Sequence, residues 1–149
     1  MEIKLSKEQY RSLIKVVYLG DWLANASKLY EQRDKEIEDI AEYIYSHANE
    51  FEIRDLSSYD KESNKTFPAV KLEEMLHEKF VDEYDNDVFR EELISRLAER
   101  DFVNKYTEEE ISEMDPFERM SKIGEIEEKY EEEIVENELK NITVKFDKD

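Results

Sequence analysis

The longest regular pattern of apolar and polar positions runs from Asp21 to Phe51, a stretch with neither Gly nor Pro. Its apolar residues recur at steps of three and four, which is the spacing of one helix face. They are Trp22, Ala26, Leu29, Tyr30, Ile37, Ile40, Ala41, Ile44, Ala48 and Phe51. Only Arg33 interrupts this stripe. The pattern therefore predicts one long central helix over residues 21–51, with a bend near residues 32–34.

Short capping motifs mark where further helices begin. Ser6 with Gln9, and Thr107 with Glu110, have the spacing of a capping box. In that motif each side chain binds the backbone amide of the other residue. Asp115, which is followed by Pro and then by Glu two positions later, is the strongest start signal in the chain. These motifs predict helices that begin near residues 7, 108 and 116, the last of them running to about residue 139.

Punctuating residues set the remaining expected boundaries. Gly20 is expected to end the first helix, so that Asp21 can cap the central one. Pro68 is expected to open a helix that reaches residue 84, and residues 85–87 are expected to separate it from a helix that ends near residue 106. Residues 54–67 are rich in Ser, Asp, Asn and Lys. They predict an irregular, solvated connector.

These elements predict an all-α fold, a bundle of about five helices around the central helix 21–51. The length favours a single domain over residues 1–149. Near the two termini, apolar residues alternate with polar ones: Ile3 and Leu5 at one end, Ile142, Val144 and Phe146 at the other. This alternation would allow a minor two-stranded pairing of the N- and C-termini.

Composition adds charge to this picture. Charged residues make up 42% of the chain and the formal net charge is −19, yet seven Phe, nine Tyr and one Trp indicate a folded core. A strongly negative chain repels phosphate backbones, so no direct nucleic-acid binding is expected. We also expect no membrane span and no apolar signal core near the N-terminus, and therefore a cytoplasmic location. The chain has no Cys, which excludes disulfides and thiolate sites.

The negative charge concentrates toward the C-terminus. Residues 108–138 hold 14 acidic and three basic residues, a net charge of −11. One side of the expected helix carries Met120, Ile123, Ile126, Tyr130 and Ile134, and the opposite side carries Glu118, Glu125, Glu128, Glu132 and Glu136. Favourable i,i+4 pairs are expected from Glu118 to Lys122 and from Glu125 to Lys129. This acidic face is interpreted either as a solvated surface that keeps the chain soluble or as a docking site for a basic protein partner.

Other candidate chemistry is sparse. Glu74 and His77 have the Glu-x-x-His spacing of helical-bundle metal sites, but such sites need two of these motifs and two further Glu. The only other histidine is His47. We therefore expect no cofactor and favour a non-enzymatic interaction or regulatory module over an enzyme. A metal-dependent all-α enzyme that uses helix carboxylates is the alternative, and a homo-oligomer joined through exposed aromatics is a third.

Overall fold

The computed structural model describes residues 3–143, and the chain divides into two compact units between Glu83 and Tyr84. The first unit holds α1 (Lys7–Asn25), η1 (Tyr30–Gln32), α2 (Lys35–Ser46), η2 (Ala48–Phe51), β1 (Ser57–Asp60), β2 (Lys65–Pro68), α3 (Val70–Leu76) and the π-helical turn η3 (His77–Val81). The second unit holds most of α4 (Asp82–Lys105), followed by α5 (Glu108–Glu113) and α6 (Pro116–Asn137).

The described chain is mostly helical, which agrees with the predicted all-α class, and it also contains one two-stranded antiparallel sheet. The segments α3, η3 and α4 follow one another without an intervening residue, so they form one helical run from Val70 to Lys105. With this run counted once, the described residues contain five α-helical runs, the number expected. The arrangement of these runs as one bundle stays a prediction.

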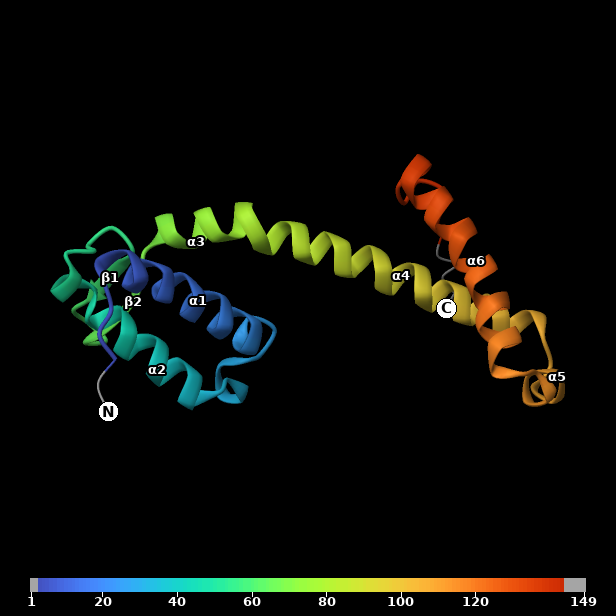
Figure 1. Cartoon of the computed structure of the whole chain (residues 1–149), viewed down its shortest axis with the longest axis horizontal. Helices are drawn as coiled ribbons and strands as arrows, with labels where there is room; N and C mark the ends of the chain where they lie inside the picture. Colours follow the sequence, from blue (N-terminus) through green and yellow to red (C-terminus); the bar gives the residue numbers. More distant parts are fainter. Residues whose placement is uncertain (1–2, 144–149) are drawn as a thin grey trace, which may run out of the picture. The chain divides into compact units, whose positions relative to one another are not determined.

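The predicted central helix over residues 21–51 is wrong. The first helix, α1, continues through Gly20 and Asp21 to Asn25, and the chain then reverses so that α2 lies beside α1 (Figure 1). A turn and the short η1 separate the two helices. The apolar spacing continues across this reversal, because α1 and α2 each present their own apolar face to a shared core. A stripe read from the sequence cannot show that the helix axis has turned back.

Asn25 holds this reversal together. Its side chain is only 3% exposed, and its Oδ1 accepts a hydrogen bond from the backbone amide of Asp34 at 2.7 Å. Its Nδ2 donates to Asp21 Oδ1 at 2.8 Å. Asp34 in turn caps α2 by accepting from the amide of Ile37 at 3.2 Å. The bond to the Asp34 amide therefore fixes the end of α1 to the start of α2, while the bond to Asp21 lies within α1 and orients the Asn25 side chain.

The core of the first unit lies between α1, α2 and the segments that follow them. Its buried side chains are Tyr10, Ile14, Tyr18, Ala41, Tyr45, Ala48, Ile53, Leu56, Leu72 and Leu76. Phe51 stacks on Tyr10 with ring centroids 3.9 Å apart, and the Tyr10 hydroxyl donates to the carbonyl oxygen of Ile44. On the surface, Arg11 forms a two-pronged ion pair with Asp55, with both N–O distances 3.0 Å. Aromatic packing thus fastens η2 to the start of α1.

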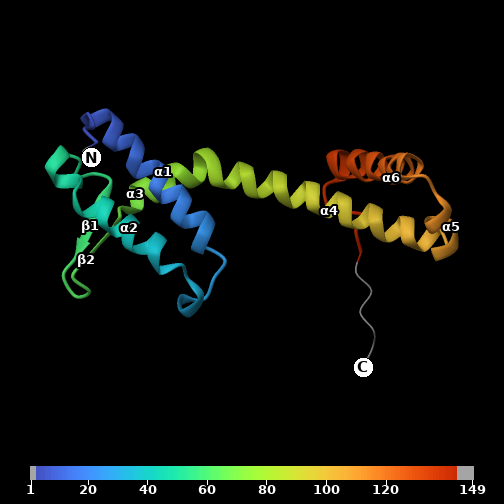
Figure 2. The same ribbon diagram turned by 60° about the horizontal axis from the view of Figure 1, so that its bottom comes forward.

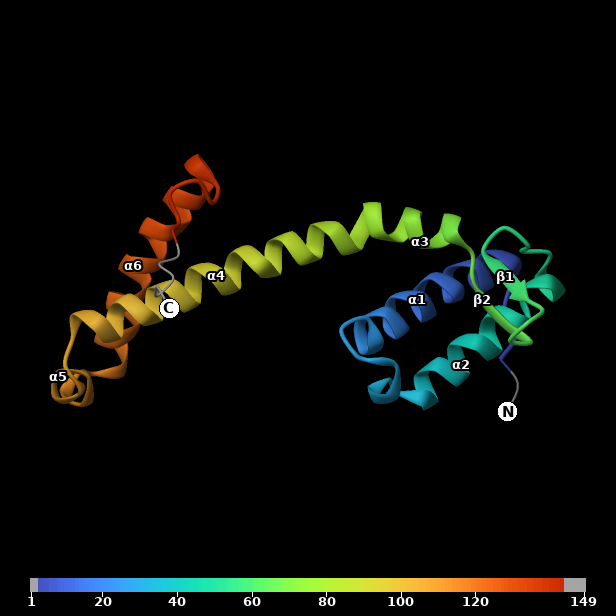
Figure 3. The same cartoon turned by 180° about the vertical axis from the view of Figure 1, so that it is seen from behind.

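Residues 54–67 are not an irregular connector. They contain an antiparallel hairpin in which Ser57 pairs with Pro68 and Asp60 pairs with Lys65, and the hairpin lies against α2 (Figure 3). The segment before it is anchored by Leu56, which is 3% exposed. Glu42 on α2 accepts a hydrogen bond from the amide of Thr66 at 3.1 Å. Polar side chains dominate the hairpin because one of its faces meets solvent. The strands therefore have few apolar residues, and the sequence pattern did not predict them.

One further predicted boundary and the predicted pairing of the termini differ from the structure. The expected break at residues 85–87 is wrong, since α4 runs through it. Residues 3–6 have no regular secondary structure, so Ile3 and Leu5 form no strand. In the other half of the expected pairing, Ile142 also has no regular secondary structure, and Val144 and Phe146 lie outside the described residues.

The capping predictions are confirmed. The amide of Ser6 donates to Gln9 Oε1 at 2.8 Å, and the amide of Gln9 donates back to Ser6 Oγ at 3.2 Å. Thr107 and Glu110 exchange the same two bonds at 2.8 and 3.2 Å. At the start of α6, Asp115 Oδ1 accepts from the amide two residues later at 2.8 Å.

Substitutions at Gly20 test whether α1 continues through this residue. A methyl group placed there would meet no atom within 4 Å, so Gly20→Ala should stabilise the first unit by about 0.5–1 kcal/mol. Urea unfolding followed by the fluorescence of Trp22, the single tryptophan, measures this. Gly20→Pro should instead destabilise by about 3 kcal/mol or more. Destabilisation by Ala would indicate that Gly20 ends the helix, as the sequence suggested.

A second variant tests the reversal. Asn25→Ala leaves the Asp34 amide without its acceptor, so it should lower the free energy of unfolding by about 1–3 kcal/mol. Asn49→Ala is the matched control, because Asn49 is exposed in η2, and its effect should stay within about 0.5 kcal/mol. If the two variants are equally stable, Asn25 does not hold the turn.

Candidate functional site

The helix α6 lies beside α4 within the second unit (Figure 2). The Tyr130 hydroxyl donates to Asp101 on α4 and accepts from Arg100 Nη2 at 3.1 Å. Nearer the start of α6, the Arg119 guanidinium lies 5.8 Å from the ring centroid of Phe102. Phe102 is 1% exposed and anchors the buried part of α4. Polar and cation–π contacts therefore hold one side of α6 against α4.

The hydrogen bond between Tyr130 and Asp101 shifts the pKa of both groups. The bond lowers the pKa of the Asp101 carboxyl, with Arg100 adding to the effect, because the charged carboxylate is the better acceptor. The same bond, followed by burial, raises the pKa of the Tyr130 hydroxyl. The contact is consequently present at neutral pH. It stabilises the second unit above the ordinary pKa of Asp, and this stabilisation is lost as pH falls through the lowered value.

The predicted acidic face is exposed along the whole of α6. Its members are Glu118, Glu125, Glu128, Glu132 and Glu136. The expected pair from Glu118 to Lys122 forms at 2.8 Å. The expected pair from Glu125 to Lys129 does not form; within residues 3–143 neither side chain takes part in an ion pair. Most of the negative charge on this face is therefore available to solvent or to a partner.

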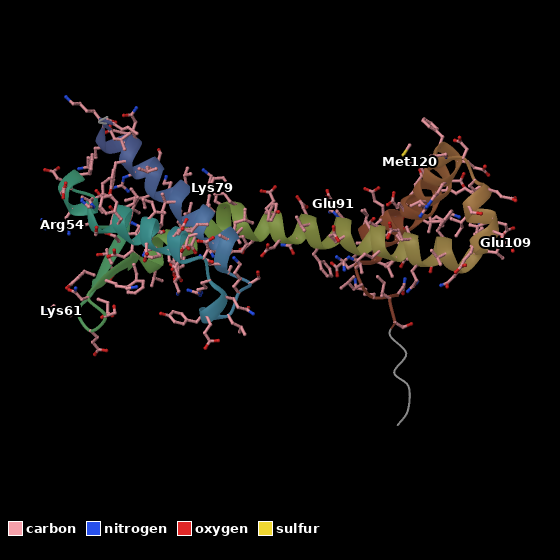
Figure 4. The ribbon with its side chains drawn as sticks, turned by 90° about the horizontal axis from the view of Figure 1, so that it is seen from below. Arg54, Lys61, Lys79, Glu91, Glu109 and Met120 are labelled. Atoms are coloured by element: carbon pink, nitrogen blue, oxygen red, sulfur yellow. The ribbon has the colours of Figure 1, made fainter. Side chains whose placement is uncertain are left out.

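Exposed apolar side chains flank the acidic face, which the sequence did not indicate. Phe117 is 75% exposed, Met120 is 63% exposed and Val135 is 67% exposed. Figure 4 shows Met120 extending outward from α6, although it was expected to belong to the apolar side. Helical spacing places these three residues between the acidic row and the side that faces α4. The whole of α6 lies within the described residues, and none of its residues is buried.

A cavity of about 330 Å³ opens near the end of α6. Its walls are mostly apolar and come from both helices: Phe89 and Leu93 on α4, then Ile134, Val135 and, just after α6, Leu139. Arg90 and Glu138 also line it. Val135 therefore lines this cavity and is also one of the three exposed apolar residues beside the acidic face. No sequence pattern joins residues 89–93 to residues 134–139, so only the folded arrangement could show this cavity.

The weaker metal candidates, Glu74 and His77, lie at the end of α3 and the start of η3. Glu74 is exposed, whereas His77 is partly buried and its Nε2 lies 3.0 Å from the Tyr18 hydroxyl. The His77 ring also meets Trp22 edge-on, with centroids 5.8 Å apart. Within residues 3–143, no group of three or more His, Cys, Asp or Glu side chains is placed to hold a metal ion.

The first unit has its own concave surface, where α1, α2 and β2 meet. Two cavities of about 290 and 240 Å³ lie there and share Asp21, Arg33, Phe67 and Pro68. We call this pair of cavities the cleft. Tyr45, which is 3% exposed, lines the larger of the two cavities.

Comparison with known proteins adds no family to this description. No protein-family model, no curated protein and no solved structure matches the chain. Over residues 3–143, no helix combines the length and the apolar character that a membrane crossing needs.

The Tyr130 contact gives a prediction for the second unit. Tyr130→Phe removes the hydroxyl that joins α6 to Asp101, so it should destabilise the packing of α6 by about 0.5–1.5 kcal/mol. Hydrogen exchange of the α6 amides measures this, with Tyr84→Phe as the control because Tyr84 is 53% exposed on the same unit. Equal exchange rates in both variants would show that the hydroxyl contributes nothing to the packing.

Proposed function

We propose that the second unit is a non-enzymatic interaction module whose α6 docks a basic, amphipathic helical segment of a protein partner. The observation that carries this proposal is the juxtaposition on α6. An exposed row of five glutamates runs beside exposed Phe117, Met120 and Val135, and no residue of the helix is buried. A helix with an apolar flank left open has a surface that a partner can cover.

The two parts of this surface support different steps of binding. The acidic row attracts a basic segment over a distance and raises the association rate, an effect that salt screens. The exposed Phe117, Met120 and Val135, together with the apolar cavity that Val135 also lines, supply the contacts that slow dissociation. A helical segment with apolar residues at every third or fourth position and Lys or Arg on its flanks matches both features.

A defined probe tests this proposal. A fluorescent helical peptide of Leu and Lys, amphipathic in design, should bind the full chain and should bind more weakly as salt rises. Changing Glu125, Glu128, Glu132 and Glu136 together to Gln should slow association roughly tenfold and change dissociation little. Stopped-flow anisotropy separates the two rates. The fold should survive, since Gln is nearly as good a helix former as Glu.

The control replaces four exposed acids of the first unit, Glu36, Glu62, Glu78 and Glu83, with Gln, which removes the same charge. This control should leave association within about twofold of the wild-type rate. Met120→Gln should instead speed dissociation. A scrambled peptide of the same composition should bind weakly. The proposal fails if both four-Gln variants slow association equally, or if the protein sediments as a dimer that excludes the peptide.

A further inference from the structure

The Tyr45 hydroxyl is a buried polar group for which the described residues 3–143 supply no hydrogen-bond partner. Buried hydroxyls are rarely left in this condition, because the lost hydrogen bond to water costs free energy. Tyr45 lines the larger cavity of the cleft. Its pKa is raised, first by burial and then by the negative charge of Asp21, so the hydroxyl stays neutral and can both donate and accept a hydrogen bond. The unpartnered hydroxyl therefore points to a polar ligand group that can hydrogen-bond with it.

The charge of the cleft indicates the chemical class of the ligand. Four carboxylates and two cations line its two cavities: Asp21, Glu38, Glu42, Glu73, Arg33 and Lys65. Four acids and two bases leave a net charge of −2. Arg33 and Glu38 form an ion pair at 3.2 Å and offset each other. The remaining carboxylates are spread over both cavities, which suits a ligand whose positive charges are separated.

The apolar surface of the cleft suits an alkyl chain between those charges. Phe67 and Pro68 line both cavities and so bridge the two groups of carboxylates. A primary ammonium of the protein itself, that of Lys35, already lies beside a carboxylate and an aromatic ring at the edge of the larger cavity. Lys35 Nζ lies 2.8 Å from Glu38 and 4.1 Å from the ring centroid of Tyr30, and both of these residues line the larger cavity. An aromatic face and a carboxylate together are a favourable environment for an ammonium group.

We propose that the cleft of the first unit binds an aliphatic diamine or polyamine, with one ammonium group donating to the Tyr45 hydroxyl and another near Glu73. This site is separate from the acidic face of α6 and does not depend on it. The alkyl chain lies against Phe67 and Pro68, and Asp21, which belongs to both cavities, stands between the two ends.

The test titrates 1,4-diaminobutane into the full chain and follows binding by calorimetry and by the fluorescence of Trp22, which lines the smaller cavity. Tyr45→Phe should weaken binding roughly tenfold, as expected for loss of a hydrogen bond to a charged group. The same variant should leave the free energy of unfolding unchanged or raised, because it removes a hydroxyl that has no partner. Tyr43→Phe, at a position 56% exposed on the same helix, should leave the affinity unchanged.

A second pair of variants tests the charge. Glu73→Gln should weaken diamine binding several-fold, because Glu73 lines the cleft. Glu74→Gln, a change at the exposed neighbouring residue, should leave the affinity unchanged. Butylamine should bind more weakly than the diamine, and 1,4-butanediol should not bind. The proposal is overturned if Tyr45→Phe binds the diamine as tightly as wild type. It is also overturned if magnesium chloride at equal charge abolishes diamine binding, or if a lysine-containing peptide binds the cleft more tightly than the diamine does.

Discussion

The side chain of Asn25 fixes the reversal between α1 and α2, and the rest of the first unit depends on it. Its oxygen accepts the Asp34 amide, and its nitrogen donates to Asp21 at the end of α1. Because the chain turns back here, Tyr45 of α2 is buried in the same core as Tyr18 of α1. The reversal also places residues of both helices around the cleft, which β2 closes from a third side.

The second unit follows a different principle, since it buries little. Ala98 and Phe102 are the buried residues of α4 beyond the unit boundary, and polar contacts such as the one from Tyr130 to Asp101 hold α6 in place. Such a helix keeps its acidic face and an apolar flank on the surface together. The first unit thus offers a concave surface, and the second offers an exposed, charged helix. These surfaces suit a small cation and a protein segment, respectively.

Local signals in the sequence predicted the local features of this structure. The capping boxes at Ser6 and Thr107 form as expected because their hydrogen bonds join residues three positions apart. The reversal after Asn25 was missed, because its decisive bond joins residues nine apart and the apolar spacing continues across it. The acidic face was found from helical spacing alone. The cleft and the orphan Tyr45 hydroxyl could not be, because both depend on residues that only tertiary packing brings together.

We propose that α6 of the second unit is a docking surface. Heteronuclear NMR of the uniformly labelled chain, recorded as the amphipathic Leu–Lys peptide is added, tests this proposal because every amide reports its own surroundings. The largest shifts are expected on α6 and on residues 89–93 of α4, while the amides of residues 7–76 should stay in place. Shifts of similar size at acidic residues throughout both units would contradict it, because they would show attraction to the net charge of −19 instead of binding at one surface.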